Sequence, residues 1–287
     1  LRYHVRHWGD ASLVTPERPP LVLIHGWMDM GASFQFLVDA IDALGGAKRH
    51  IIAPDWRGFG LTEAPAGDHY WFGDYLGDLD TLLDQLVPAD QRIDLLGHSL
   101  GGNVVMIYAG VRPQRIRKLI NLEGFGLPAT KPQQAGKRLA QWLDELKTPQ
   151  QFAPYADAPA VAARLMKNNP RLPADKAAWL ATQWGELRSD GRWHLRADAA
   201  HKRANPVLYR VDEVLATWHA ITAPLLWVEG ANTDMTKWWG ERYPRAEFEQ
   251  RLAVVGDVQR VMLDDCGHML HHDQPLRVAQ LLADFLM

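Results

Sequence analysis

Apolar residues in this chain gather in short, uninterrupted runs separated by longer amphipathic stretches. The runs occupy residues 21–25, 51–55, 93–96, 119–122, 224–228 and 260–263. Short runs without polar alternation are typical of parallel strands buried on both faces. Between them, apolar positions recur at helical spacing in residues 34–44, 75–86 and 276–286. The alternation predicts an α/β fold with a mostly parallel central sheet flanked by helices.

One long stretch interrupts this alternation. Residues 127–222 contain no strong strand pattern, and their tryptophans and leucines fall at helical spacings. We therefore expect a mostly helical insertion at 127–222 in a core made of residues 1–126 and 223–287.

The composition is that of a globular protein. The chain has 287 residues, of which 47% are hydrophobic and 23% charged, and a formal net charge of −3, which gives no electrostatic basis for binding nucleic acid. The single cysteine, Cys266, excludes an intrachain disulfide. No apolar run approaches the length of a membrane span, so we expect a cytoplasmic protein without membrane association. The chain begins at Leu1, and we expect it to have been trimmed.

The third apolar run ends in Gly97-His98-Ser99-Leu100-Gly101, where a helical pattern begins. A G-x-S-x-G pentapeptide between a strand and a helix is typical of a nucleophile elbow. Side chains two residues before and after the serine would collide with the neighbouring strand and helix, and glycine avoids this. We therefore predict that Ser99 is a catalytic nucleophile.

A serine nucleophile needs a base, and in this kind of fold the histidine follows the last strand. There the sequence reads Cys266-Gly267-His268, and we predict His268 as the base. His271 and His272 are rivals, but they lie nearer the final helix and lack the preceding glycine. For the oxyanion hole we predict two backbone amides, those of Leu100 and of Trp27 in His25-Gly26-Trp27.

These segments, with Asp55-Trp56-Arg57-Gly58-Phe59-Gly60, resemble those of serine hydrolases with the α/β-hydrolase fold. The resemblance covers essentially the whole chain, and the His-Gly-Trp-Met-Asp start is similar to the branch called serine hydrolase-like proteins. The loop at residues 55–60 also resembles that of epoxide hydrolases and haloalkane dehalogenases. Those enzymes use an aspartate nucleophile, so Ser99 argues against both activities. The resemblance implies that residues 127–222 form a cap over the active site.

The resemblance leaves the third catalytic residue open. In most of the family an aspartate follows the strand before the last one, but here Asn232 falls at that position and Asp234 comes two residues later. The rival is Glu123, at the end of the strand after the elbow helix, an arrangement similar to that of some haloalkane dehalogenases. We favour Glu123 and keep Asp234 as the alternative acid.

We expect the chain to hydrolyse a carboxylic ester, a lactone or a related acyl bond through an acyl-enzyme. The number of tryptophans in the insertion favours an apolar or aromatic small-molecule substrate, with four aromatic residues as candidate contacts: Trp56, Phe59, Trp142 and Trp184. Neither a metal-ligand spacing nor a phosphate-binding glycine loop is recognisable, so we expect no cofactor and no metal.

Two alternatives use the same fold. A C–C bond hydrolase of a vinylogous keto acid would need a basic residue in the insertion that faces the substrate carboxylate, and Arg188, Arg192 and Arg196 are candidates. A ligand-binding receptor or scaffold with vestigial turnover is the other, although the intact catalytic segments count against it.

Overall fold

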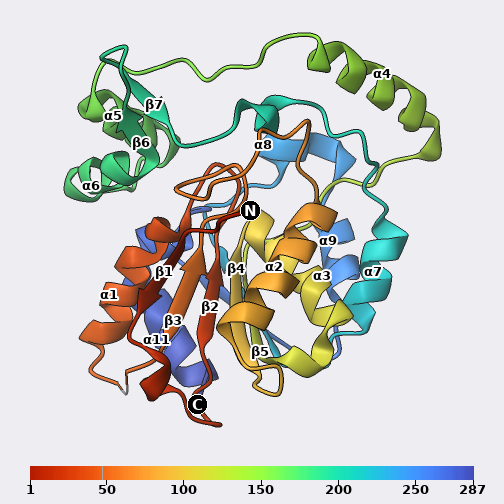
Figure 1. Ribbon diagram of the computed structural model, residues 1–287. Helices are drawn as coiled ribbons and strands as arrows, with labels where there is room; N and C mark the ends of the chain where they lie inside the picture. Colours follow the sequence, from red (N-terminus) through yellow and green to blue (C-terminus); the bar gives the residue numbers. More distant parts are fainter. Residues whose placement is uncertain (47) are drawn as a thin grey trace.

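A computed structural model describes residues 1–46 and 48–287 (Figure 1). In this part of the chain the main sheet has seven strands, in the order β1-β3-β2-β4-β5-β8-β9. The first strand runs antiparallel to its neighbour, and the other pairs are parallel, which confirms the predicted mostly parallel sheet. The strands are β1 (Val5–Trp8), β2 (Leu21–Ile24), β3 (Ile51–Pro54), β4 (Ile93–His98), β5 (Ile116–Leu122), β8 (Leu225–Gly230) and β9 (Val258–Leu263).

Helices cover both faces of the sheet (Figure 1). One face carries α1 (Gln35–Ala43) and α11 (Pro275–Phe285), and the other carries α2 (Phe72–Leu86), α3 (Leu100–Val111), α7 (Val211–His219) and α9 (Arg245–Leu252). In β2, Val22 and Ile24 pack into the apolar cluster beneath α2 and α3, whereas Leu21 and Leu23 pack into the cluster beneath α1 and α11. This burial on both faces explains the uninterrupted apolar runs.

Most of the insertion lies beyond one end of the sheet. It contains α4 (Ala135–Leu146), α5 (Ala158–Asn168) and α6 (Ala174–Trp184), followed by an antiparallel hairpin of β6 (Gly185–Leu187) and β7 (Trp193–Leu195) that we did not predict. Strands of three residues are too short to leave a recognisable pattern. α5 and α6 share a small apolar cluster of their own, whereas α4 extends away from them (Figure 1).

The last part of the insertion packs against the core. α7 lies on α3 so closely that a Cβ atom on Gly110 would come within 1.8 Å of the carbonyl oxygen of Thr217. Trp218 is buried in the same apolar cluster as α3. α7 therefore packs with the core helices, although it falls within residues 127–222.

Candidate active site

Ser99 lies at the sharp turn between β4 and α3. Its backbone φ is +53°, an unfavourable value for a residue with a side chain. A Cβ atom on Gly97 would come within 2.4 Å of the Gly101 carbonyl oxygen, and one on Gly101 within 2.3 Å of the Ile24 carbonyl oxygen of β2. Both flanking positions therefore require glycine, which explains the G-x-S-x-G pattern.

His268 lies in the loop between β9 and α10 (Leu270–Asp273) and reaches back to the elbow. Its Nε2 atom is 2.9 Å from the Ser99 Oγ atom. The two rival histidines are directed elsewhere, since the Nε2 atoms of His271 and His272 lie 3.0 and 2.7 Å from the Ser33 Oγ atom. The structure thus brings His268 to Ser99 and keeps the other two in the core.

Glu123 follows the last residue of β5 and meets the opposite edge of the same imidazole. Its Oε2 atom is 2.6 Å from the His268 Nδ1 atom, and the carboxylate also accepts hydrogen bonds from the Gly230 amide (2.7 Å) and the Thr233 hydroxyl (3.0 Å). Asp234 is exposed.

The carboxylate of Asp234 instead accepts hydrogen bonds from the amide and hydroxyl of Thr236, at 2.9 and 2.6 Å. It lies two residues before α8 (Thr236–Trp239) and takes no part in the arrangement around His268. Of the two candidate acids, Glu123 alone contacts the imidazole.

Burial acts on both charges of the His268–Glu123 pair. Desolvation lowers the pKa of His268 below its ordinary value and raises the pKa of Glu123, while the hydrogen bonds from Gly230 and Thr233 oppose the shift of the carboxyl. A neutral imidazole at neutral pH has a free lone pair with which to accept a proton. The arrangement therefore suits a general base next to a hydroxyl nucleophile.

The loop after β2 lies against the elbow. A Cβ atom on Gly26 would come within 3.1 Å of the Cβ atom of Ser99, so the backbone here passes close to the nucleophile. In the described part of the chain, neither the Trp27 amide nor the Leu100 amide donates a hydrogen bond to protein. Two unpaired amides beside a serine suit the stabilisation of an oxyanion. His25 braces this loop, because its Nε2 atom accepts a hydrogen bond from the Trp56 amide (2.8 Å).

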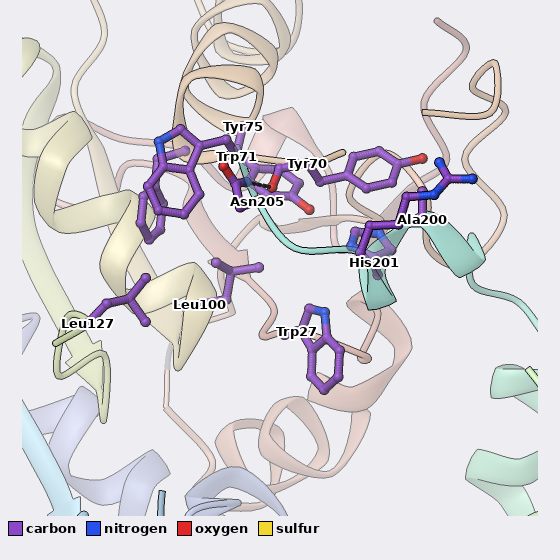
Figure 2. A pocket seen from close by; sticks show the side chains of 11 residues that line it. Trp27, Tyr70, Trp71, Tyr75, Leu100, Leu127, Ala200, His201 and Asn205 are labelled. Atoms are coloured by element: carbon purple, nitrogen blue, oxygen red, sulfur yellow. Dashed lines mark hydrogen bonds between the residues drawn. The ribbon is translucent and has the colours of Figure 1, made fainter. Parts of the chain in front are cut away.

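Two cavities meet at the side chain of Trp27, which lines both and is 54% exposed. The larger has a volume of about 630 Å³, lies between the loop of His268 and α5, α6 and the hairpin, and includes His268 in its wall. Most of its wall is apolar, with side chains that include Met28, Leu165 and Leu180. The smaller, of about 160 Å³, lies on the other side, among Leu100, Tyr70, Trp71 and His201 (Figure 2).

The four predicted aromatic contacts fall in different places. Trp184 lines the larger cavity as expected. We expected Trp56 in the cavity wall, but it is fully buried in the core. Its ring packs on Tyr75, and its Nε1 atom donates a hydrogen bond to the His25 carbonyl (3.2 Å). Phe59 is also buried, stacked on the imidazole of His201.

Trp142, on α4, packs edge-on against His69 and does not line the larger cavity. The sequence reading missed Trp238, which lies in the cavity wall with its ring centroid 4.7 Å from that of His268. Its position in α8, shortly after β8 and near the expected site of the acid, was the available signal.

The three arginines considered for a substrate carboxylate lie outside the larger cavity. Arg188 and Arg196 pair with Glu186, with closest N–O distances of 2.8 and 3.7 Å, and Arg192 contacts the Pro154 carbonyl. A different arginine, Arg164 of α5, lines it, and within the described residues Arg164 makes no ion pair.

The model of the α/β hydrolase fold family matches residues 19–275. The chain is 23% identical over 282 residues to a serine hydrolase-like protein of Danio rerio, an alignment that covers 93% of this chain and 81% of the relative. It is also 32% identical over 111 residues to a 2-hydroxy-6-oxo-2,4-heptadienoate hydrolase of Pseudomonas putida, which covers 38% of each chain.

Among solved structures, the thioesterase domain from the curacin biosynthetic pathway superposes with a TM-score of 0.80 at 25% identity, covering 98% of this chain and 95% of that domain. No helix in the described residues is both long and apolar enough to cross a membrane. The resemblance deduced from the sequence motifs is confirmed by the match over most of the chain. The chain is a hydrolase and belongs to the α/β-hydrolase fold family.

Proposed function

We propose that this protein is a serine hydrolase that cleaves a carboxylic ester or a related acyl bond, such as a thioester or a lactone. The proposal depends on one observation, the hydrogen-bonded chain from Ser99 through His268 to Glu123, with distances of 2.9 and 2.6 Å. The likeness to a thioesterase domain supports the same class of reaction.

In the proposed mechanism, the Ser99 oxygen attacks the acyl carbon while His268 Nε2 takes the hydroxyl proton. The bond to the leaving oxygen or sulfur then breaks, and His268 returns the proton to that atom. Water attacks the acyl-enzyme by the same route and releases the acid. Glu123 accepts the Nδ1–H hydrogen bond throughout, which leaves Nε2 free to act as the base and stabilises the imidazolium.

The amides of Trp27 and Leu100 would bind the oxyanion of each tetrahedral intermediate. In comparable sites one such donor contributes about 3 to 4 kcal/mol to transition-state stabilisation. The close packing of Gly26 on Ser99 supports this role, because it brings the start of the loop next to the nucleophile.

The larger cavity supports an apolar substrate of small or medium size, in agreement with the expectation from the sequence. We propose that the insertion acts as a cap from residue 127 to about residue 210, with α5, α6 and the hairpin forming the outer wall of this cavity. The proposed substrate contacts are Trp184, Trp238 and the exposed side chain of Trp27.

The test is hydrolysis of a p-nitrophenyl ester series, from acetate to decanoate, by the wild type and Ser99→Ala. We expect turnover by the wild type and a loss of at least about 1,000-fold in the variant, with an unchanged circular dichroism spectrum. Equal turnover by the two proteins would refute the mechanism.

A C–C bond hydrolase is the second candidate, and Arg164 is the observation that favours it. This guanidinium lines the larger cavity together with His268 and could bind the carboxylate of a vinylogous keto acid. The partial likeness to a 2-hydroxy-6-oxo-2,4-heptadienoate hydrolase supports it as well. Turnover of such a dienoate, weakened in Arg164→Gln through KM, would favour this candidate, whereas activity on neutral esters alone would exclude it.

A further inference from the structure

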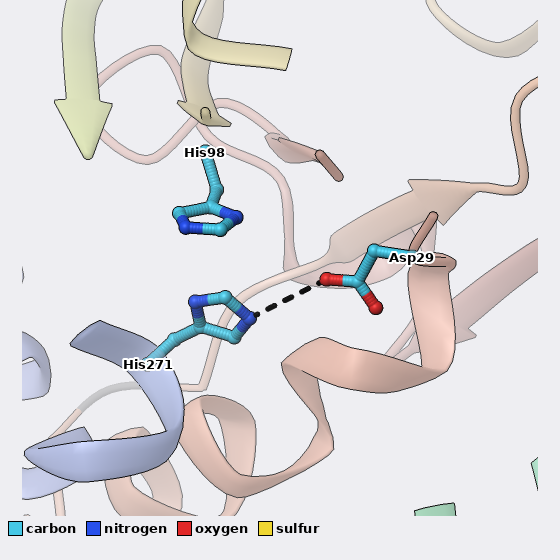
Figure 3. A group of neighbouring side chains, drawn as sticks. All are labelled: Asp29, His98 and His271. Atoms are coloured by element: carbon cyan, nitrogen blue, oxygen red, sulfur yellow. Dashed lines mark ion pairs between the residues drawn. The ribbon is translucent and has the colours of Figure 1, made fainter. Parts of the chain in front are cut away.

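Three buried side chains converge near the nucleophile: Asp29, His98 and His271 (Figure 3). Each is at most 3% exposed. One donor atom from each lies within 4.8 Å of the other two, and the Asp29 Oδ2 atom is 3.9 Å from the His271 Nε2 atom. The proposed mechanism uses none of these side chains.

The hydrogen bonds of His98 fix the position of its proton. Its Nε2 atom is 2.8 Å from the His268 carbonyl oxygen, which only accepts, so Nε2 carries the hydrogen. The Nδ1 atom therefore has a lone pair, and within the described residues it has no hydrogen-bond partner.

The same reasoning applies to His271. The Nε2 atom of His272 lies 3.2 Å from the Ser33 carbonyl oxygen and 2.7 Å from the Ser33 hydroxyl, so it is the donor to Ser33. The hydroxyl hydrogen then points to His271 Nε2, 3.0 Å away, which accepts it. This nitrogen therefore carries the lone pair of the neutral ring, and it lies 3.9 Å from the Asp29 Oδ2 atom.

The described hydrogen bonds give these three acceptor atoms a single donor, the Ser33 hydroxyl at His271 Nε2. The Asp29 Oδ2 atom and the His98 Nδ1 atom are both without a hydrogen-bond partner. Burying acceptors together without a donor is costly, and a cation removes that cost. Two imidazole nitrogens and one carboxylate oxygen are ligands that Zn²⁺ and similar divalent metals favour.

We propose that Asp29, His98 and His271 form a binding site for a divalent transition metal of the Zn²⁺ type. The metal would bind His98 Nδ1, Asp29 Oδ2 and His271 Nε2, the last in place of the Ser33 hydroxyl. The His98 Nε2–H bond to a backbone carbonyl is the second interaction that metal-binding histidines usually make. Donors on a tetrahedral Zn²⁺ are about 3.3 Å apart, so the three atoms, which lie within 4.8 Å of one another, need to approach by up to about 1.5 Å.

An entry route leads from the substrate cavity. Asp29 lines a small hollow together with Met28 and Trp184, and both of these residues also line the larger cavity. A metal ion would pass from the cavity to the site when Met28 moves aside. The site is therefore buried but not isolated from the active site.

The first measurement uses Co²⁺ as a spectroscopic probe. The full-length protein, freed of metal by dialysis against a chelator, is titrated with Co²⁺ at neutral pH, and the visible absorption bands of Co²⁺ are followed before displacement by Zn²⁺. We expect one equivalent to bind, with bands that report imidazole ligands. Absence of stoichiometric binding would overturn the proposal and leave a buried water as the donor.

Substitution of the proposed ligands tests whether the metal binds at this site. Asp29→Asn and His271→Gln should each weaken Zn²⁺ binding at least about 100-fold in isothermal titration, since each removes a direct ligand. Thermal unfolding of each variant without metal shows whether that variant is folded. If a variant is not folded, the Co²⁺ spectrum of the wild type still tests the proposal. Unweakened binding in both folded variants would overturn the proposal.

Two control variants test whether the metal binds at another histidine-containing site. His50→Asn disrupts the His7–His50 pair at the sheet edge, whose Nδ1 and Nε2 atoms are 3.0 Å apart, and Ser99→Ala alters the proposed catalytic site. Both should bind Zn²⁺ like the wild type. Loss of binding in either would assign the metal to that place and refute the site at Asp29.

Discussion

The Oε2 atom of Glu123 lies 2.6 Å from the Nδ1 atom of His268, although the two residues are 145 positions apart in the chain. Glu123 follows β5 and His268 follows β9, and the carboxyl ends of parallel strands meet at one edge of the sheet. The glutamate approaches from β5, while the Gly230 amide at the end of β8 holds its other oxygen. Gly230 and Thr233, on either side of the usual acid position after β8, thus both donate hydrogen bonds to Glu123.

This arrangement predicts different effects for the two candidate acids. Glu123→Gln should lower kcat by about 100- to 10,000-fold, because a neutral amide neither fixes the tautomer of His268 nor stabilises its imidazolium. Asp234→Asn should stay within about twofold of the wild type, because Asp234 is exposed and its carboxylate contacts Thr236 rather than His268. Equal losses in both variants would contradict the assignment.

The same substitution should change the pH profile. An ionised Glu123, 2.6 Å from His268, favours the protonated form of this histidine, whereas burial lowers its pKa. Removing the charge in Glu123→Gln should therefore shift the acidic limb of kcat/KM to lower pH. Residual activity of the variant, measured from pH 4 to 9 with a short-chain ester, gives the shift. A limb that moved to higher pH would mean that the carboxyl does not act on His268.

Chain-length preference should depend on Trp184. Trp184→Ala removes an indole from the wall of the larger cavity but leaves Ser99 and His268 untouched. We expect the optimum of the ester series to move to longer chains, with kcat on acetate changed by less than about threefold. Trp142→Ala, outside this cavity, is the matched control and should keep the wild-type optimum.

The elbow makes a prediction about stability. Gly101→Ala places a methyl group 2.3 Å from the Ile24 carbonyl oxygen, where only backbone can give way, and should lower the free energy of unfolding by about 3 kcal/mol. Gly73→Ala in α2 meets no atom within 4 Å and should change it by no more than about 1 kcal/mol, in the stabilising direction. Urea unfolding measures both. Similar midpoints would show that the elbow tolerates a side chain.

The features that sequence predicts here are those with a local cause. The burial of β2 on both faces is visible in the sequence as an apolar run, and the crowding at Gly97 and Gly101 is visible as the G-x-S-x-G motif. The loop after the last strand identified His268 in the same way. Each of these signals lies within a few neighbouring residues.

What escaped prediction depends on distant contacts. Trp56 stands beside a recognisable motif, but only the packing of Tyr75 and His25 decides that it faces the core. α7 has the pattern of any amphipathic helix, and its contact with Gly110 assigns it to the core. The choice between Glu123 and Asp234 also depends on where the ends of β5 and β8 lie relative to His268, which the sequence does not show.

The separate apolar cluster of α5 and α6 has a consequence for the evolution of this chain. Its members Leu165, Leu172 and Leu180 also line the larger cavity, yet they belong to neither of the two clusters that flank the sheet. Substitutions among them reshape the cavity while the packing around the sheet stays intact. Selection can therefore alter what the enzyme accepts without disturbing the residues proposed to carry out the reaction.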